Sequence, residues 1–98
     1  MNMQAMLKQA QALQKDMMKA KDEIDKSDFI GESSLVKVTM KGTKEVISVE
    51  INSDDSLDKD DIEMLEDMIV VAINDANKQI DDITEKKMSK FGNIPGLF

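Results

Sequence analysis

The chain has 98 residues and a net charge of −7, with nine methionines, three phenylalanines and no cysteine, histidine, tryptophan or tyrosine. The lack of cysteine and histidine excludes disulfides, thiolate zinc sites, a cysteine nucleophile and the commonest general base of enzymes. No apolar run reaches the roughly 20 residues that span a bilayer, and the first residues do not have the pattern of a secretory signal. These features predict one soluble intracellular domain.

The charge is distributed unevenly along the sequence. Residues 1–21 hold four lysines and one aspartate, and residues 86–98 hold three lysines and no acid. Residues 52–85 hold twelve acids and two lysines. Both ends are therefore basic and the centre is acidic. We expect a negatively charged partner to bind at the ends.

The first expected element is a long helix, within an arm that spans residues 1–27. The sequence from Met3 to Lys26 contains no glycine or proline and is rich in good helix formers. Apolar or small side chains recur along two rows of a coiled-coil-like seam. The first row is Met3, Ala10, Met17 and Ile24, and the second is Met6, Leu13, Ala20 and Ser27.

A row of charged side chains lies opposite this seam. Lys8, Lys15 and Lys19 recur at helical spacing and share one face with Asp22 and Lys26. One interpretation is the solvated face of an amphipathic helix, and the other is a track of contacts to DNA phosphates. A second lysine cluster favours DNA, and its members are Lys86, Lys87 and Lys90. The chain has no arginine, the residue that most often contacts guanine specifically. This absence argues against strong sequence-specific recognition of bases.

Residues 28–52 are expected to form a small antiparallel sheet. Phe29–Glu32 is the first predicted strand, residues 34–40 are the second, and residues 45–51 are the third. The turn between the last two contains Gly42, where a tight hairpin favours positive φ.

Alternation along these strands predicts which side chains share a face. The apolar positions of the second strand are Val36, Val38 and Met40. In the third strand we expect Ile47, Val49 and Ile51 on one face and Val46, Ser48 and Glu50 on the other.

A second long helix is expected over residues 58–91, followed by a tail over residues 92–98. An apolar stripe at helical spacing predicts the helix, and its members are Ile62, Leu65, Ile69, Ala72, Ile73, Ala76, Ile80 and Ile83. Gly92 ends the helix, and the sequence NIPGLF forms the tail.

The acidic run NSDDSLDKDD before this helix supplies candidate N-caps. An EF-hand template places oxygen ligands between Asn52 and Glu63, but Leu57 occupies the position that needs glycine. We therefore interpret the run as a helix-capping loop and expect no metal and no cofactor. The carboxylates lie on a solvated loop and helix, and the glycines form no phosphate loop, so we predict that the chain is not an enzyme.

The predicted fold class is α+β: a long N-terminal helix, a small antiparallel sheet of about three strands, and a long C-terminal helix. The simplest way to bury the apolar stripes and the open sheet edge is a two-fold dimer. The residues expected at the dimer and packing surfaces are Met3, Met6, Leu13, Met17, Val36, Val38, Met40, Ile69, Ile73 and Ile80.

Several segments resemble the YbaB/EbfC family of bacterial nucleoid-associated proteins, in the same order along nearly the whole chain. They are MLKQAQALQKDM, GES, LVKVTMKG, VEIN, DIEMLEDMIVVAINDA and NIPGLF. The resemblance implies a single domain over residues 1–98 and a tweezer-like homodimer whose sheets join. It also implies binding to double-stranded DNA that organises the nucleoid, and a location in the cytoplasm. The family often has a glycine-rich link after GES, whereas here only Ser33 and Ser34 stand there, so a shorter connection is expected.

The leading hypothesis is a homodimer that contacts duplex phosphates with weak sequence preference and has no membrane or small-molecule partner. The lysines expected at DNA follow from charge and facing, and they are Lys8, Lys15, Lys19, Lys86, Lys87 and Lys90. The alternative is a non-enzymatic protein-interaction module that uses the acidic centre and the methionine-rich seam.

Overall fold

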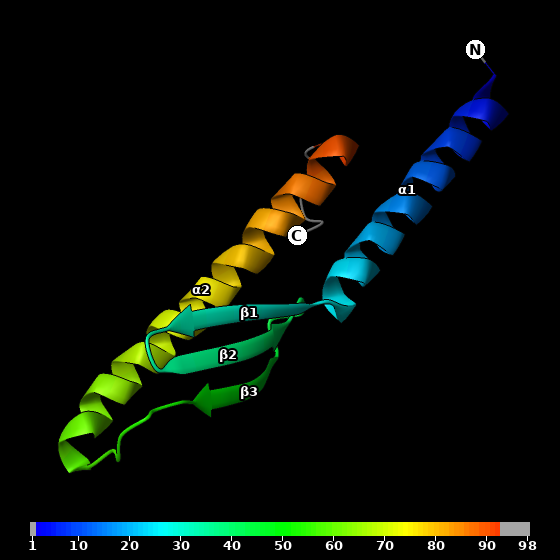
Figure 1. Ribbon diagram of the computed structural model, residues 1–98. Coiled ribbons are helices and arrows are strands. Elements are labelled where there is room, and N and C mark those ends of the chain that lie inside the picture. The colour runs from blue at the N-terminus through cyan, green and yellow to red at the C-terminus, as the bar shows by residue number, and fades with distance from the viewer. Residues whose placement is uncertain (1, 93–98) are drawn as a thin grey trace.

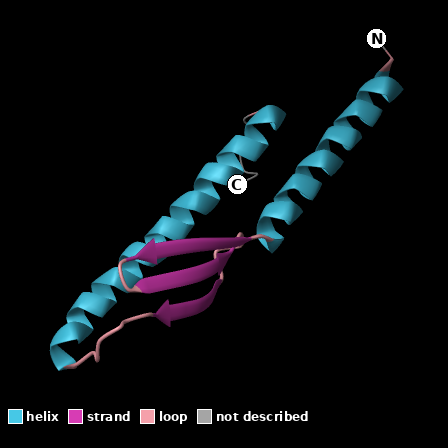
Figure 2. Cartoon of the chain, in the orientation of Figure 1, coloured by secondary structure: helices cyan, strands magenta, loops and turns pink. Residues whose placement is uncertain are grey.

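The computed structural model describes residues 2–92. It contains helix α1 (Met3–Lys26), strands β1 (Asp28–Ser33), β2 (Val36–Lys41) and β3 (Val46–Ile51), and helix α2 (Ile62–Met88). Short 3-10 helices, η1 (Lys59–Asp61) and η2 (Ser89–Phe91), precede and follow α2. The predicted α+β class and its helix–sheet–helix order are confirmed (Figures 1 and 2). Apart from Gly92, the expected tail lies outside the described residues.

Helix α2 packs on one face of strands β1 and β2 in the antiparallel sheet, whose strand order is β1-β2-β3. The alternating side chains of β2 form the core, because Val36, Val38 and Met40 are each at most 1% exposed. They pack on Ala72 and Ala76, which the same chain supplies from α2. The apolar face of β2 is therefore covered within one chain and does not need a second subunit.

Gly31 explains how closely β1 approaches α2. A Cβ atom at this position would overlap the carbonyl oxygen of Ala72 and lie 2.7 Å from the amide nitrogen of Ala76. The small side chains of Ala72 and Ala76, both fully buried, let the two backbones meet at this point. Gly31 thus fixes the depth at which the helix sits on the sheet.

The edge of β1 is covered by polar side chains of α2. The Asp75 carboxylate accepts a hydrogen bond from the Glu32 amide at 3.1 Å. The Gln79 side-chain amide donates to the Ile30 carbonyl at 2.8 Å. These contacts occupy backbone groups that an edge strand otherwise exposes.

Strand β3 differs from the prediction at its start. The register pairs Val36 with Ile51, Val38 with Val49 and Met40 with Val46, with an irregularity beside Met40. Val46 therefore lies on the same face as Val49 and Ile51, and its predicted placement with Ser48 and Glu50 was wrong. The physical reason is a bulge at Ile47, which shifts the alternation by one residue.

The role predicted for Gly42 was also wrong. The residue with positive φ in this turn is Lys44, at 74°. Gly42 is needed because a Cβ there would overlap the carbonyl oxygen of Ile24, and its amide donates to the Ser27 carbonyl at 3.1 Å. Gly42 thus holds the end of α1 against the hairpin.

Helix α1 runs beside the C-terminal part of α2 and extends past its end (Figure 1). The two helices meet where Met17 packs with Met88 and Phe91, and Ala20 packs against this cluster. The described chain is elongated, with extents of 70 × 19 × 16 Å. The N-terminal half of α1 is consequently exposed on every side in the single chain.

The acidic loop caps η1, the short helix that leads into α2, whereas Asp61 at the N-cap of α2 itself makes no side-chain capping hydrogen bond. The Asp58 carboxylate accepts from the Asp60 amide at 2.9 Å, and the Asp61 carboxylate accepts from the Asp58 amide at 2.9 Å. This reciprocal pair is a capping box, which satisfies amides that have no partner within the helix.

Candidate nucleic-acid interface

The lysine stripe of α1 is paired at one end only. Lys8, Lys15 and Lys19 are exposed, and none of them forms an ion pair with a residue between 2 and 92. Lys26, at the other end of the stripe, lies 2.9 Å from the Asp22 carboxylate. The hydrogen bond to Asp22, helped by its negative charge, raises the pKa of the Lys26 ammonium above its ordinary value. The three upstream ammonium groups are therefore the ones available to an external anion.

The second predicted lysine cluster lies at the end of α2. Lys86 and Lys90 form no ion pair within the described residues, and the Lys90 ammonium lies 5.0 Å from the centre of the Phe91 ring. Lys87 lies 3.9 Å from the Glu23 carboxylate of α1, a long and exposed ion pair. Such a pair contributes little to stability. The Lys87 ammonium can therefore leave Glu23 to contact an external anion. Lys86 and Lys87 also complement the negative end of the α2 dipole.

The fold brings both basic segments to one end of the molecule. In Figure 1 the N-terminal half of α1 and the end of α2 lie together at one end, and the start of α2 with its acidic loop lies at the other. Twelve of the 20 acidic residues lie in residues 52–85, and the basic clusters lie before and after that segment. The acidic loop therefore lies far from the exposed lysines of α1, and a polyanion is attracted to the end that carries these lysines and repelled by the end that carries the loop.

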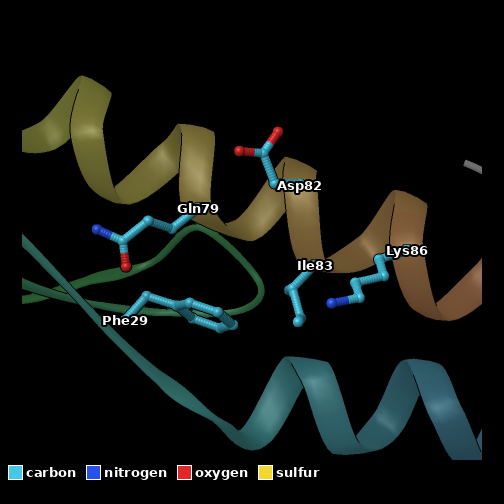
Figure 3. A pocket seen from close by; sticks show the side chains of 5 residues that line it. All are labelled: Phe29, Gln79, Asp82, Ile83 and Lys86. Carbon is cyan, nitrogen blue, oxygen red and sulfur yellow. The ribbon is translucent and has the colours of Figure 1, made fainter.

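An open groove lies between α2 and the start of β1 (Figure 3). It has a volume of about 320 Å³ and is lined by Phe29, Gln79, Asp82, Ile83 and Lys86. Phe29 and Ile83 face each other across it, whereas Asp82 points away. No cluster of three metal-ligating side chains occurs in residues 2–92.

The residues predicted for dimer and packing surfaces divide into two groups. Those of the second helix and sheet, together with Met17, are buried or half-buried within the chain; they are Met17, Val36, Val38, Met40, Ile69, Ile73 and Ile80. Met3, Met6 and Leu13 are instead 77%, 50% and 44% exposed. Their assignment to an interface remains a prediction.

Sequence reasoning missed an apolar surface on β3. Val46, Val49 and Ile51 share a face with the core residues of β2, yet they are 42%, 42% and 44% exposed. The reason is that α2 lies over β1 and β2 and does not extend over β3. The sequence signal was the alternation in EVISVEI, which marks an apolar face and does not say whether a helix covers it.

The matches to known proteins agree with this organisation. The model of the YbaB/EbfC DNA-binding family matches residues 1–94. The chain belongs to this family. Two similar members of known name are both nucleoid-associated proteins. The one from Lactococcus lactis subsp. cremoris (strain MG1363) is 46% identical over 93 residues, which is 93% of each chain. The one from Streptococcus pneumoniae (strain Hungary19A-6) is 45% identical over 98 residues, which is 97% of this chain and 98% of the relative.

Membership in the YbaB/EbfC family confirms the resemblance found in the sequence segments. Among the helices of the described part of the chain, none is long and apolar enough to cross a membrane.

Proposed function

We propose that this protein is a non-enzymatic, nucleoid-associated homodimer that holds duplex DNA through lysine contacts to phosphates. The match of residues 1–94 to a DNA-binding family carries the proposal. Its location is the bacterial cytoplasm, on the nucleoid, and the proposed function requires no cofactor, membrane or small-molecule substrate. The relatives named nucleoid-associated proteins support this assignment.

The proposed DNA contacts are the ammonium groups at the basic end. Lys8, Lys15 and Lys19 lie along one face of α1 and span roughly 16 Å of helix at 1.5 Å per residue. Duplex DNA carries one negative charge per roughly 1.7 Å of its axis, so each ammonium finds a phosphate without a fixed register. Phosphate contacts of this kind position a protein but carry no base information, which accounts for the weak sequence preference.

The proposed dimer surface is the uncovered face and edge of β3. Unlike β1, whose edge receives Asp75 and Gln79, β3 has no contact of this kind from another element among residues 2–92. Its three exposed apolar side chains, Val46, Val49 and Ile51, lie beside that edge. A second copy that pairs through β3 would bury both the unpaired backbone groups and the apolar face.

The dimer surface can be tested by placing a carboxylate on it. We expect Val49→Asp to convert the protein to monomers at micromolar concentration, because the charge would be buried without a partner. The matched control is Ser48→Asp, which adds the same group on the opposite face of β3. Sedimentation should give the mass of one chain for Val49→Asp and of two chains for the control. Dimers in both variants would exclude this surface.

Binding to unrelated duplexes separates the proposal from its rival. In a gel-shift assay at about 50 mM salt, we expect two duplexes of unrelated sequence to bind with similar affinity. The alternative function is a protein-interaction module built on the acidic centre and the methionine-rich seam. The exposure of Met3 and Met6 favours that reading. No shift of either duplex at low salt would replace the DNA proposal with the alternative.

A further inference from the structure

The seam of α1 is only half covered by the described chain. It consists of the side chains that share one face of this helix, which are Met3, Met6, Ala10, Leu13, Met17, Ala20 and Ile24. At its C-terminal end, Met17 and Ile24 are 5% and 4% exposed. Before Met17 the exposed fraction rises to 44% at Leu13, 50% at Met6 and 77% at Met3. The described chain therefore leaves the seam from Met3 to Leu13 without a packing partner.

We propose that this uncovered part of the seam packs antiparallel on the same part of α1 in a second copy of the chain. In that arrangement Met3 of one copy faces Leu13 of the other, and Met6 faces Ala10. A large side chain thus meets the small one of Ala10, and the pairing is self-complementary, as a two-fold contact requires. It ends at Leu13, one helical turn before Met17, which α2 and η2 of the same chain already cover.

The charges of this part of α1 suit such a contact. The only charged side chains in residues 2–15 are Lys8 and Lys15, and both occupy the heptad position farthest from the seam. The positions that flank the seam are uncharged, and they are Asn2, Leu7, Gln9 and Gln14. The contact would therefore bury no charge, and it would leave the proposed DNA-binding lysines on its outer surface.

The contact between α1 helices lies far from the proposed contact through β3. Val49 pairs with a β2 residue that packs on Ala72, so the β3 contact lies beside the middle of α2. From Ala72 to Met88 the helix rises roughly 24 Å. Met17 packs beside Met88, and α1 continues from Met17 to Lys8 for a further roughly 14 Å in the same direction (Figure 1).

Two separate two-fold axes follow from this distance. The axis that relates two antiparallel helices runs perpendicular to them, here at the level of Lys8, and so it does not pass through β3. Repeated use of both contacts would join dimers into an open chain, in which each α1 links one dimer to the next. The open chain rests on the proposed β3 dimer, whereas the contact between α1 helices does not.

Cysteine cross-linking tests this contact, because the chain has no cysteine of its own. Met3→Cys and Leu13→Cys are prepared as separate proteins and mixed in equal amounts. The matched control mixes Met3→Cys with Ala12→Cys, whose exposed side chain lies on the other side of the helix. A disulfide requires Cα atoms roughly 4.4–6.8 Å apart, so its rate of formation reports proximity. Mass spectrometry distinguishes the mixed product from products of two identical chains.

We expect the disulfide between positions 3 and 13 to form on the order of tenfold faster than the one between positions 3 and 12, because packing raises the local thiol concentration. Equal rates would overturn the proposal. A preference for bonds between identical positions would also overturn it, since parallel helices would give that result. The same outcome is expected when Val49→Asp is added to every chain, so that failure of the β3 dimer would not affect this test.

Sedimentation of the reduced proteins gives an independent check. The contact is small and should form at sub-millimolar rather than micromolar concentration. There we expect the wild-type protein to form larger species than Met6→Gln, which places a polar group of similar length in the seam. Identical mass distributions for the two proteins would contradict the proposal.

Discussion

Replacing Lys8, Lys15 and Lys19 together with glutamine is expected to weaken DNA binding strongly while the fold persists. All three side chains are exposed and form no ion pair within the described residues, so their loss removes no internal contact. If each lysine contacts one phosphate, affinity at 50 mM salt should fall roughly a thousand-fold. Fluorescence anisotropy with a labelled duplex measures the effect, and glutamate at the same positions should abolish binding.

The matched control for this variant is the triple replacement of Lys37, Lys59 and Lys78 with glutamine. It changes the net charge by the same amount, and these lysines also form no ion pair within the described residues. They lie on the sheet, the acidic loop and the middle of α2, away from the basic end. We expect a much smaller loss of affinity. Equal losses in the two triple variants would mean that total charge, and not the stripe, determines binding.

Gly31→Ala is expected to destabilise the fold by about 3 kcal/mol or more. The added methyl group would overlap the Ala72 carbonyl oxygen and crowd the Ala76 amide nitrogen, both of which belong to the backbone of α2. Backbone atoms cannot rotate out of the way, so β1 and α2 would have to separate and open the core around Val38. Denaturant unfolding followed by circular dichroism, at one fixed protein concentration, measures the change.

Two further variants show whether the backbone contact is the cause. Glu32→Ala changes the neighbouring exposed side chain of β1, and we expect less than about 0.5 kcal/mol from it. Adding Ala72→Gly to Gly31→Ala should not restore stability, because the obstructing atom is the carbonyl oxygen and not the methyl group. Rescue by Ala72→Gly would show that side-chain crowding is responsible.

Periodicity was sufficient to predict the element order and the core of β2. Val36, Val38 and Met40 alternate in the sequence, and they are the large side chains that the fold buries completely. The functions of Gly31 and Gly42 were missed because they depend on neighbours far along the chain, Ala72 and Ile24. The sequence gives the position of each glycine, but only the fold shows which backbone segment packs against it.

The sequence also predicted those features of the candidate site that depend on spacing within one helix. Helical spacing placed Lys8, Lys15 and Lys19 on one face, and the contact of Lys26 with Asp22 follows from their separation along the helix. The ion pair of Lys44 with Asp81 joins the hairpin to α2, and no local pattern indicates it. The uncovered face of β3 likewise depends on how far α2 extends over the sheet.

The slope of log K against log salt concentration tests most directly whether a lysine stripe holds DNA through phosphates. Each phosphate contact releases counterions and contributes about −0.9 to the slope for a duplex. We therefore predict a slope of about −3 when the stripe of one chain is engaged and about −5 when both chains of a dimer contribute. A slope near zero would contradict the account, because affinity would then come from contacts that the lysines do not make.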